Sequence, residues 1–595
     1  MVQTDNNSRV SLSASTIRSE KANSGNAHVS SDAQAINLEK QQTANSEPSI
    51  TQESISHKES RDVIKSSKEQ EEGTSEEPRS SGAPIQMTKF RRIIVFLSLA
   101  LTMLLAALDL TIVTTAIPKI SEQFKALSDA TWIATAYMLT TTALQPLYGR
   151  LSDTFGRVPT LVASIVIFIV GSGVCGGANS MGVLIFGRAL QGVGGAGLMA
   201  LVFIIISDVT SEEERPAYLG VLGAVWSVAS VIGPVLGGVF SEKVTWRWAF
   251  YINLPISGAV LIIVIVFLRL PQPQGSLWSK LKKIDFLGSL VLIGAVVMLL
   301  LALTWGGKNF PWKSARVICL LVFGVLALGV FMLIEWKTSA EPTVPLRMFR
   351  NRNVSLSVIG QFFMGAAMFT PMFFIPIWYT IVKNSGTISA GLHLLPYLLS
   401  ISLVSVASGF LVTKTGRYRA MVIAGTALFV VGTGLMVLFD ENINFGKQVG
   451  FMLLMGVGLG FNIQILLIVV QTASKTEDMA ASTTLFLFMR VLGSSIGVAV
   501  MQSVFQNALL PKLNQLIALY PEFAQDFTNS IDDQSNIYKN AAMPDDVRAQ
   551  LIHVFVLALQ KVFIATIPFA AVAFLFTIPL KHIPLRANTK FSVGE

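Results

Sequence analysis

Apolar stretches of about 20 residues recur along the chain between residues 93 and 580, separated by polar segments. Each can cross the hydrocarbon core of a bilayer as a helix, which satisfies its own backbone hydrogen bonds in lipid. A mean hydropathy of +0.58 and a charged fraction of 14% exclude a soluble chain of 595 residues. The sequence therefore predicts an all-α integral membrane protein. We expect fourteen spans, at residues 93–117, 131–148, 160–178, 182–207, 217–240, 247–268, 284–304, 315–335, 354–381, 388–411, 419–439, 448–472, 480–505 and 553–580.

Basic residues between the spans predict how the chain is oriented. Residues 1–88 hold nine Lys/Arg and thirteen Asp/Glu, so the rest carries a net charge of +13 against +9 for the whole chain. The positive-inside rule places both termini and the basic loops in the cytoplasm. The charge therefore reflects topology and does not indicate a nucleic-acid partner. The basic residues that alternate in this way are Arg150, Arg157, Arg269, Lys280, Lys282, Lys283, Arg347, Arg350, Arg352, Lys414, Arg417 and Arg419.

A charged segment, GRLSDTFGR at residues 149–157, lies between two apolar spans and returns as GFLVTKTGR at 409–417. Its charges exclude it from hydrocarbon, so we expect a loop at the membrane surface. A loop repeated at equivalent places predicts a transporter built from two similar halves. We assign these halves to residues 89–268 and 353–585, with two additional spans inserted in 269–352.

Three segments lie outside the predicted spans. Residues 1–88 are rich in Ser, Gln, Glu and Asn, which predicts a disordered cytoplasmic tail that is either a plain solvated segment or a carrier of phosphorylation or trafficking signals. Residues 586–595 form a second cytoplasmic tail. Residues 506–552 form the one long loop on the outer side, either a small extracellular cap or a spacer.

Several motifs lie at defined places in or between these spans: LDLTIV at 108–113 with AIP at 116–118, GRLSDTFGR at 149–157, RALQG at 188–192, GPVLGG at 233–238, WRWAFYINLP at 246–255, DFLG at 285–288 and PLRMF at 345–349. Together they resemble the fourteen-span drug/proton antiporter branch of the major facilitator superfamily, over about residues 90–585. In overall character the chain is similar to fungal toxin and multidrug efflux pumps. The resemblance implies a major-facilitator fold of two six-helix halves plus two inserted helices.

Asp109 and Arg188 are the candidate proton-coupling residues. At 1.5 Å per residue, Asp109 lies roughly 12 Å and Arg188 roughly 9 Å from the outer ends of their spans, so the unlike charges share one layer. Ionisable residues at this depth normally face a bundle interior or a wet cavity. We expect Asp109 to carry the proton. Arg188 cannot release its own proton, so we expect it to adjust the proton affinity of Asp109. The alternative is a static pair that only fixes helix packing.

The resemblance also implies gating residues. In the charged segment Asp153 and the arginines can form an ion-pair network that latches the cytoplasmic side. In the fifth span, small residues and a proline allow close helix approach and a bend, which predicts either tight packing or a hinge that limits leak in an exporter. The candidate gating residues are Arg150, Asp153, Gly156, Arg157, Gly233, Pro234, Gly237 and Gly238.

Aromatic and uncharged polar residues in the spans suit a largely apolar organic compound. The candidate substrate-binding residues are Trp132, Tyr137, Gln145, Trp226, Gln361, Gln464 and Gln471, of which many could instead be packing residues. For Arg490, in span 13, a structural contact within the second half is favoured over a contact with substrate.

No enzymatic activity, metal site or cofactor is expected. The run GVGGAG at 192–197 fits a dinucleotide fingerprint formally, but it lies inside an apolar span with no strand before it. We expect a monomeric proton-driven exporter of small apolar or amphipathic toxic compounds, in the cell membrane or alternatively the vacuolar membrane. The competing hypotheses are a siderophore or nutrient transporter on the same scaffold and a non-transporting membrane receptor.

Overall fold

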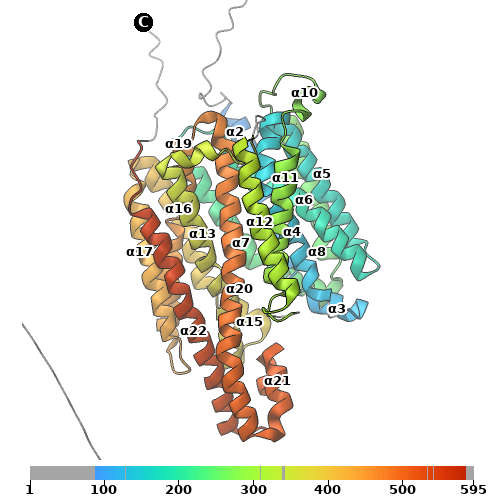
Figure 1. Ribbon diagram of the computed structural model, residues 1–595, viewed down its shortest axis with the longest axis vertical. Coiled ribbons are helices and arrows are strands. Elements are labelled where there is room, and N and C mark those ends of the chain that lie inside the picture. The colour runs from blue at the N-terminus through green and yellow to red at the C-terminus, as the bar shows by residue number, and fades with distance from the viewer. Residues whose placement is uncertain are drawn as a thin grey trace, which may run out of the picture. The chain divides into compact units, whose positions relative to one another are not determined.

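The computed structural model describes residues 88–584, apart from 127–128, 308–309, 338–341, 533 and 541, and this part of the chain forms a bundle of helices (Figure 1). The two predicted tails lie outside the described residues except for Thr88. The hydroxyl of Thr88 caps the first helix by accepting a hydrogen bond from the backbone amide of Arg91. Within the described part, thirteen helices are long and apolar enough to cross a membrane.

The first half of the bundle contains six membrane-spanning segments and two short helices. Its helices are α2 (Lys89–Ile112), α3 (Ile117–Phe124), α4 (Ala130–Phe155), α5 (Arg157–Gly176), α6 (Met181–Val209), α7 (Arg215–Val239), α8 (Trp248–Tyr251) and α9 (Asn253–Phe267). The first span begins and ends earlier than predicted, because α2 runs from Lys89 to Ile112.

The two inserted spans are α11 and α12, and the second half follows them. The helices are α10 (Leu277–Leu281), α11 (Phe286–Trp305), α12 (Ala315–Lys337), α13 (Arg352–Met368), α14 (Thr370–Lys383), α15 (Thr387–Leu392), α16 (Leu395–Thr415), α17 (Arg419–Leu435), α18 (Phe445–Gly460), α19 (Ile465–Ala473), α20 (Met479–Leu519), α21 (Ala524–Asp532) and α22 (Asp545–Thr577).

The predicted span 131–148 lies in α4, which is not among the thirteen apolar helices. Its 26 residues correspond to roughly 39 Å, which is enough to cross a bilayer. The buried side chains Gln145 and Arg150 lower its apolar content. They are accommodated because α4 packs against α6 of its own half and α20 of the other. Packing against protein thus replaces part of the apolar surface that lipid would require.

Several predicted spans consist of two consecutive helices. Span 354–381 consists of α13 and α14, which meet at Phe369, just before the proline at position 371. Span 448–472 consists of α18 and α19, separated by residues 461–464. A proline cannot continue the backbone hydrogen bonding of the preceding turn, which accounts for the first break.

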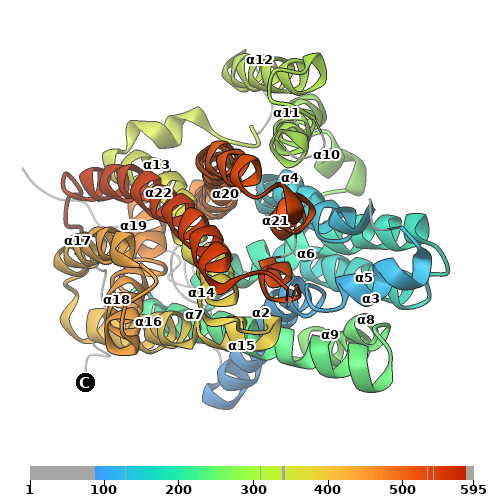
Figure 2. The ribbon, with the colours of Figure 1, turned by 90° about the horizontal axis from the view of Figure 1, so that it is seen from below.

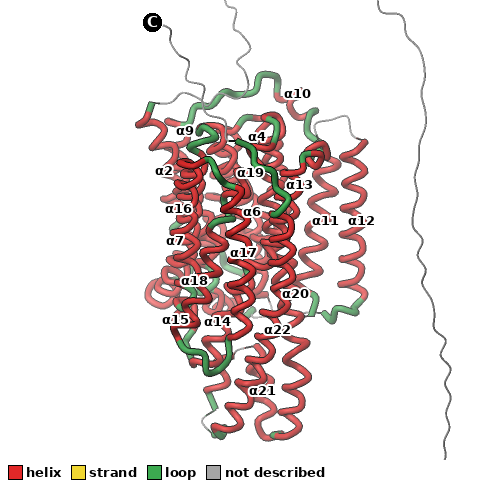
Figure 3. The backbone as a smooth tube through the Cα atoms, turned by 90° about the vertical axis from the view of Figure 1, so that its left-hand side faces the viewer, coloured by secondary structure: helices red, strands yellow, loops and turns green. Residues whose placement is uncertain are grey.

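The segment predicted as a loop, 506–552, is largely helical. Helix α20 continues to Leu519, α22 begins at Asp545, and α21 lies between them, so that this segment forms a helical hairpin beyond the rest of the bundle (Figure 3). Its apolar side chains face one another. Leu513, Leu516, Phe527, Val547 and Leu551 are all buried in one core cluster with residues of the second half. The amphipathic pattern of this segment therefore builds helix–helix packing outside the apolar span.

The bundle has two distinguishable ends. We call the end at which α2 begins, α4 ends and α13 begins the basic end, and the end with the α20–α22 hairpin the hairpin end. Seen along the bundle, the two halves form separate groups of helices, and α11 and α12 lie at the edge (Figure 2). Helix α11 packs against α4 and α20, and the halves meet where α4 packs on α20 and α7 on α16.

Candidate functional site

Asp109 and Arg188 form an ion pair inside the first half. Arg188 Nη1 lies 2.7 Å from Asp109 Oδ2, and the two side chains are 1% and 0% exposed. Asp109 belongs to α2 and Arg188 to α6, so the pair joins two helices. Their similar depth in the sequence predicted this proximity, and the contact confirms it.

Two amides complete the shell around this carboxylate. Gln191 Nε2 and Asn253 Nδ2 both donate to Asp109 Oδ1, at 2.7 and 2.8 Å. Gln191 lies one turn beyond Arg188 on α6, and Asn253 is the first residue of α9. We call Asp109, Arg188, Gln191 and Asn253 the Asp109 cluster. It ties three helices to one carboxylate.

Arg188 has further partners besides Asp109. Its Nε donates to the carbonyl oxygen of Ile133 at 2.8 Å, and its Nη1 donates to Gln191 Oε1 at 2.6 Å. Its guanidinium carbon lies 4.4 Å from the centre of the Tyr137 ring, within the range of a cation–π contact. These partners hold Arg188 in place independently of Asp109, but none of them supplies a negative charge.

The predicted gating residues of α7 pack directly beside the Asp109 cluster. A side chain on Gly233 would overlap Thr111 Oγ1, and one on Gly237 would overlap the carbonyl oxygen of Ile112. Thr111 Oγ1 donates to the carbonyl of Ala229 at 3.3 Å. Thr115 Oγ1 likewise donates to the carbonyl of Pro234 at 3.3 Å, and Gly238 is buried on the same helix. The α2–α7 contact thus depends on small residues.

The charged segment at 149–157 forms an ion-pair network at the basic end. Arg157 Nη1 lies 2.5 Å from Asp153 Oδ1, and its Nε lies 2.9 Å from Asp208 Oδ2 at the end of α6. Arg150 Nη1 lies 3.8 Å from Asp153 Oδ2, and its Nε donates to the carbonyl oxygen of Pro342 at 2.5 Å. The network joins α4, α5 and α6 to the segment that follows the inserted helices.

The loop expected at 149–157 is almost entirely helical. Arg150 and Asp153 lie in the last turns of α4, and Gly156 alone separates α4 from α5. Gly156 has φ of +102°, a backbone conformation that favours glycine. The charges escape the hydrocarbon because both helices extend to the surface, so no separate loop is needed.

The two halves touch at the basic end through glycines. A Cβ on Gly149 of α4 would press on the carbonyl oxygen of Ala480 and the side chain of Thr484, both in α20. A Cβ on Gly220 of α7 would meet the Ser405 carbonyl of α16. In the reverse direction, a Cβ on Gly409 of α16 would overlap the Pro216 carbonyl of α7. Backbone therefore packs on backbone between the halves.

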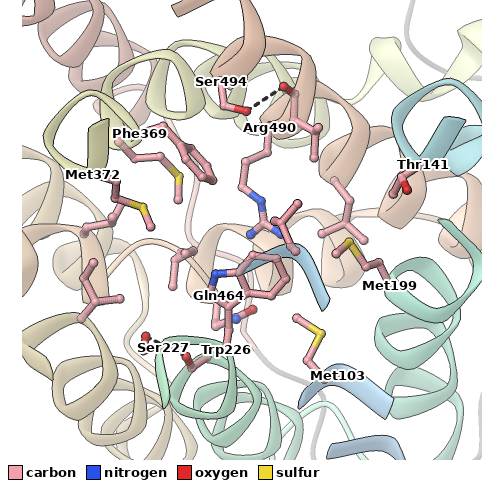
Figure 4. A pocket seen from close by; sticks show the side chains of 18 of the residues that line it. Met103, Thr141, Met199, Trp226, Ser227, Phe369, Met372, Gln464, Arg490 and Ser494 are labelled. Atoms are coloured by element: carbon pink, nitrogen blue, oxygen red, sulfur yellow. Dashed lines mark hydrogen bonds between the residues drawn. The ribbon is translucent and has the colours of Figure 1, made fainter. Parts of the chain in front are cut away.

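A cavity lies between the halves. Figure 4 shows its sulfur-containing and aromatic side chains, with a few polar groups among them. Both halves contribute to the wall, since α2, α4, α6 and α7 face α13, α16, α18 and α20. The labelled lining residues are Met103, Thr141, Met199, Trp226, Ser227, Phe369, Met372, Gln464, Arg490 and Ser494. An apolar wall with few polar groups is typical of sites for organic molecules, and methionine adapts to varied shapes.

This fold matches a known family of membrane proteins. Residues 99–498 match the family model described as Major Facilitator Superfamily, which covers more than half of the chain. The chain belongs to the major facilitator superfamily. It is a multi-pass membrane protein with the helical fold of that family.

Major facilitator proteins of fungi are similar over most of the chain. The chain is 38% identical over 487 residues to the efflux pump dotC of Dothistroma septosporum, and the alignment covers 82% of this chain and 83% of dotC. It is 34% identical over 516 residues to the efflux pump FUS6 of Gibberella moniliformis, covering 84% and 90% of the two chains. The efflux pump aflT of Aspergillus parasiticus is 36% identical over 475 residues, with 77% and 92% covered.

A solved major facilitator structure shares the fold. The crystal structure of the human organic anion transporter MFSD10 (TETRAN) aligns with a TM-score of 0.54 and 15% sequence identity. The alignment covers 83% of this chain and all of the MFSD10 chain. At this identity the likeness establishes the architecture alone.

Four of the seven candidate substrate-binding residues line the cavity of this major facilitator protein: Tyr137, Gln145, Trp226 and Gln464. The other three lie elsewhere. Trp132 packs edge-on against Trp305 of α11, with ring centres 6.1 Å apart. Gln471 is buried and donates to Thr483 Oγ1 at 3.2 Å. Gln361 is 1% exposed in α13, away from the cavity lining.

Several residues of both sites were missed from the sequence. Gln191 and Asn253 carried a signal, because each is an amide side chain in a quoted motif, RALQG or WRWAFYINLP. Asp208 could have been found as an acidic residue directly after the predicted span 182–207, on the same side of the membrane as Arg157. The cavity methionines had no distinguishing signal, since the chain contains 20 methionines, and packing alone shows which of them line the cavity.

Proposed function

We propose that this protein is a proton-coupled antiporter that exports toxic organic compounds, either fungal secondary metabolites or xenobiotic drugs. The similar fungal proteins dotC, FUS6 and aflT are efflux pumps by name, which supports export. We place the protein in the cell membrane, with the vacuolar membrane as the alternative, and expect it to act as a monomer. The proton gradient supplies the energy, with no bound cofactor.

The observation that carries the proposal is the Asp109 cluster. A charged carboxylate holds Arg188, Gln191 and Asn253 together, and so holds α2, α6 and α9. A proton on Asp109 removes the charge that attracts Arg188 and weakens both amide hydrogen bonds. The contacts between the three helices then change strength with each proton bound and released. This is the link between protonation and helix movement that an antiporter requires.

The charges at the basic end indicate how the bundle is oriented in the membrane. Arg150, Arg157, Arg347 and Arg419 lie at this end, and the positive-inside rule assigns it to the cytoplasm. The glycine contacts between the halves lie at the same end. In this orientation we infer that the glycine contacts close the cavity toward the cytoplasm, so that the compound leaves outward as a proton enters.

The energy is sufficient. A proton moving inward through 100 mV releases about 2.3 kcal/mol, before a pH difference is added. This corresponds to roughly a fifty-fold gradient of a neutral compound per proton. A pump with this coupling can keep a toxic compound well below its external concentration.

The test is transport by the purified full-length protein in proteoliposomes with an imposed pH difference. We expect fluorescein or rhodamine 123 to accumulate in vesicles with an acidic lumen, and Asp109→Asn to abolish the accumulation. Asp546→Asn is the control, because Asp546 is exposed at the hairpin end. Transport that persists without any gradient, or that requires ATP, contradicts the proposal.

The same assay separates the competing hypotheses. A siderophore or nutrient importer moves its compound in the same direction as the protons. A receptor binds a compound without moving it. Either result would overturn export by antiport.

A further inference from the structure

Arg490 differs from the other buried charges of the bundle. It lies in α20, and its side chain points into the cavity, where the side chains of Gln464 and Trp226 also converge (Figure 4). Among the described residues, its guanidinium has neither a hydrogen-bond partner nor an ion-pair partner. This placement contradicts the expectation of a structural contact within the second half.

The cavity holds other unpaired polar atoms near this cation. Gln464 is 4% exposed, and its Oε1 has no hydrogen-bond partner among the described residues. Oε1 of Gln145, which also lines the cavity, likewise has no hydrogen-bond partner among the described residues. Buried polar groups are normally paired, and leaving one unpaired costs free energy. Their gathering in one cavity indicates a place that a bound molecule completes.

Among the described residues, no carboxylate lines the cavity that holds Arg490. Asp109 is occupied by Arg188, Gln191 and Asn253. Glu335 lies at the basic end of α12, where its Oε1 accepts the backbone amide of Val344. The counter-charge for Arg490 therefore has to come from the bound molecule.

We propose that Arg490 binds the anionic group of an organic acid, so that the exported compounds carry a carboxylate or ionised phenol on a largely apolar body. A guanidinium presents several donors in one plane and matches a carboxylate in geometry. Gln464 Oε1 accepts a hydroxyl beside the acidic group, and the methionines and Trp226 contact the apolar body. This inference rests on the proposed function, because it names the class of compound that the cavity exports.

The proposal has an electrical consequence. Export of a monoanion in exchange for one inward proton moves two charges across the membrane, whereas export of a neutral compound moves one. The membrane voltage therefore contributes twice as much free energy to the export of a monoanion as to the export of a neutral compound.

The test compares two dyes with the same ring framework. Fluorescein is an anion at pH 7.5 and rhodamine 123 is a cation. We measure the binding of each to the full-length protein in detergent, without any gradient, by fluorescence anisotropy. We expect the wild type to bind fluorescein at least tenfold more tightly than rhodamine 123. Equal binding of the two dyes, or no binding of fluorescein, overturns the proposal without any variant.

Variants show whether Arg490 is responsible. Arg490→Gln should weaken fluorescein binding at least tenfold and leave rhodamine 123 binding unchanged or tighter, and Arg490→Lys should keep the preference for the acid. Lys561→Gln is the matched control, since it removes a positive charge from an exposed site on α22. An equal loss of both dyes in Arg490→Gln indicates a structural role and overturns the assignment.

The binding assay is independent of proton coupling. If fluorescein binds selectively but a pH difference drives no transport, the proposed function fails and the anion site stands. If transport is proton-driven but binding ignores the charge of the dye, the proposed function stands and the anion site fails.

Discussion

Thr111 Oγ1 occupies the space that a Cβ of Gly233 would need, so α2 and α7 touch two residues beyond Asp109. The small residues of α7 thereby lie against the helix that carries the proposed proton site. A change in the α2–α7 contact and a change in the state of Asp109 act on the same short stretch of α2. This proximity joins two motifs that the sequence presented separately.

Gly233→Ala should therefore impair both stability and coupling. The added methyl group overlaps Thr111 and forces α2 and α7 apart, with a cost of about 1–3 kcal/mol. We expect a lower thermal unfolding temperature in detergent and a faster proton leak in proteoliposomes. Gly258→Ala is the control, because nothing lies within 4 Å of a Cβ at that position of α9. Equal leak in the two variants would disprove the close-packing role.

Removing one charge of the Asp109–Arg188 pair should be more harmful to folding than removing both. Asp109→Asn leaves a buried guanidinium without its counter-ion, at a cost of about 3–5 kcal/mol. The double variant with Arg188→Gln removes this cost, so its thermal stability should recover. Proton-driven transport should remain absent in both variants. Recovery of transport in the double variant would assign the pair to packing alone.

Gly149→Ala should open the basic end. The methyl group presses on Ala480 and Thr484 of the other half and weakens the closed contact. We expect a membrane-impermeant thiol reagent applied at the basic end to label Ser494→Cys in the cavity several-fold faster, in a background with Cys175→Ser and Cys319→Ser. Gly173→Ala is the control, because a Cβ there meets nothing within 4 Å. Unchanged labelling would show that this contact does not close the cavity.

The hairpin should contribute to stability through its buried leucines. Leu513 is 1% exposed and Leu519 is 68% exposed, and both lie near the end of α20. Leu513→Ala should reduce the free energy of unfolding by about 2–5 kcal/mol, because it leaves a cavity in the packed hairpin. Leu519→Ala should have little effect. Thermal unfolding of the purified variants measures the difference, and equal unfolding temperatures would contradict the observed packing.

Hydropathy predicted most of the spans because a membrane helix needs a long apolar run, and such runs are easily read. The limits of this signal are visible in particular elements. Residues 506–552 form helices from amphipathic sequence outside the apolar region, so their polar residues suggested a loop. The Arg150–Arg157 segment was expected to be a loop for the same reason. In both places polar and charged residues lie within helices that extend beyond the apolar region.

The site was partly predictable. Counting residues from the span ends places Asp109 and Arg188 in one layer, and the ion pair follows from unlike charges at equal depth. The contributions of Gln191 and Asn253 depend on how α6 and α9 are rotated about their axes, which depth does not specify. The direction of Arg490 depends likewise on the rotation of α20. Its charge was evident in the sequence, but its lack of a partner is a property of the packed bundle.

The glycine contacts at the basic end bear on how easily the halves can part. A Cβ on Gly149, Gly220 or Gly409 would meet main-chain atoms of the opposite half. Two helices that contact each other through their backbones can separate without rearranging interlocked side chains. The glycine contact between the halves at the basic end can therefore be broken and remade many times at a small cost in free energy.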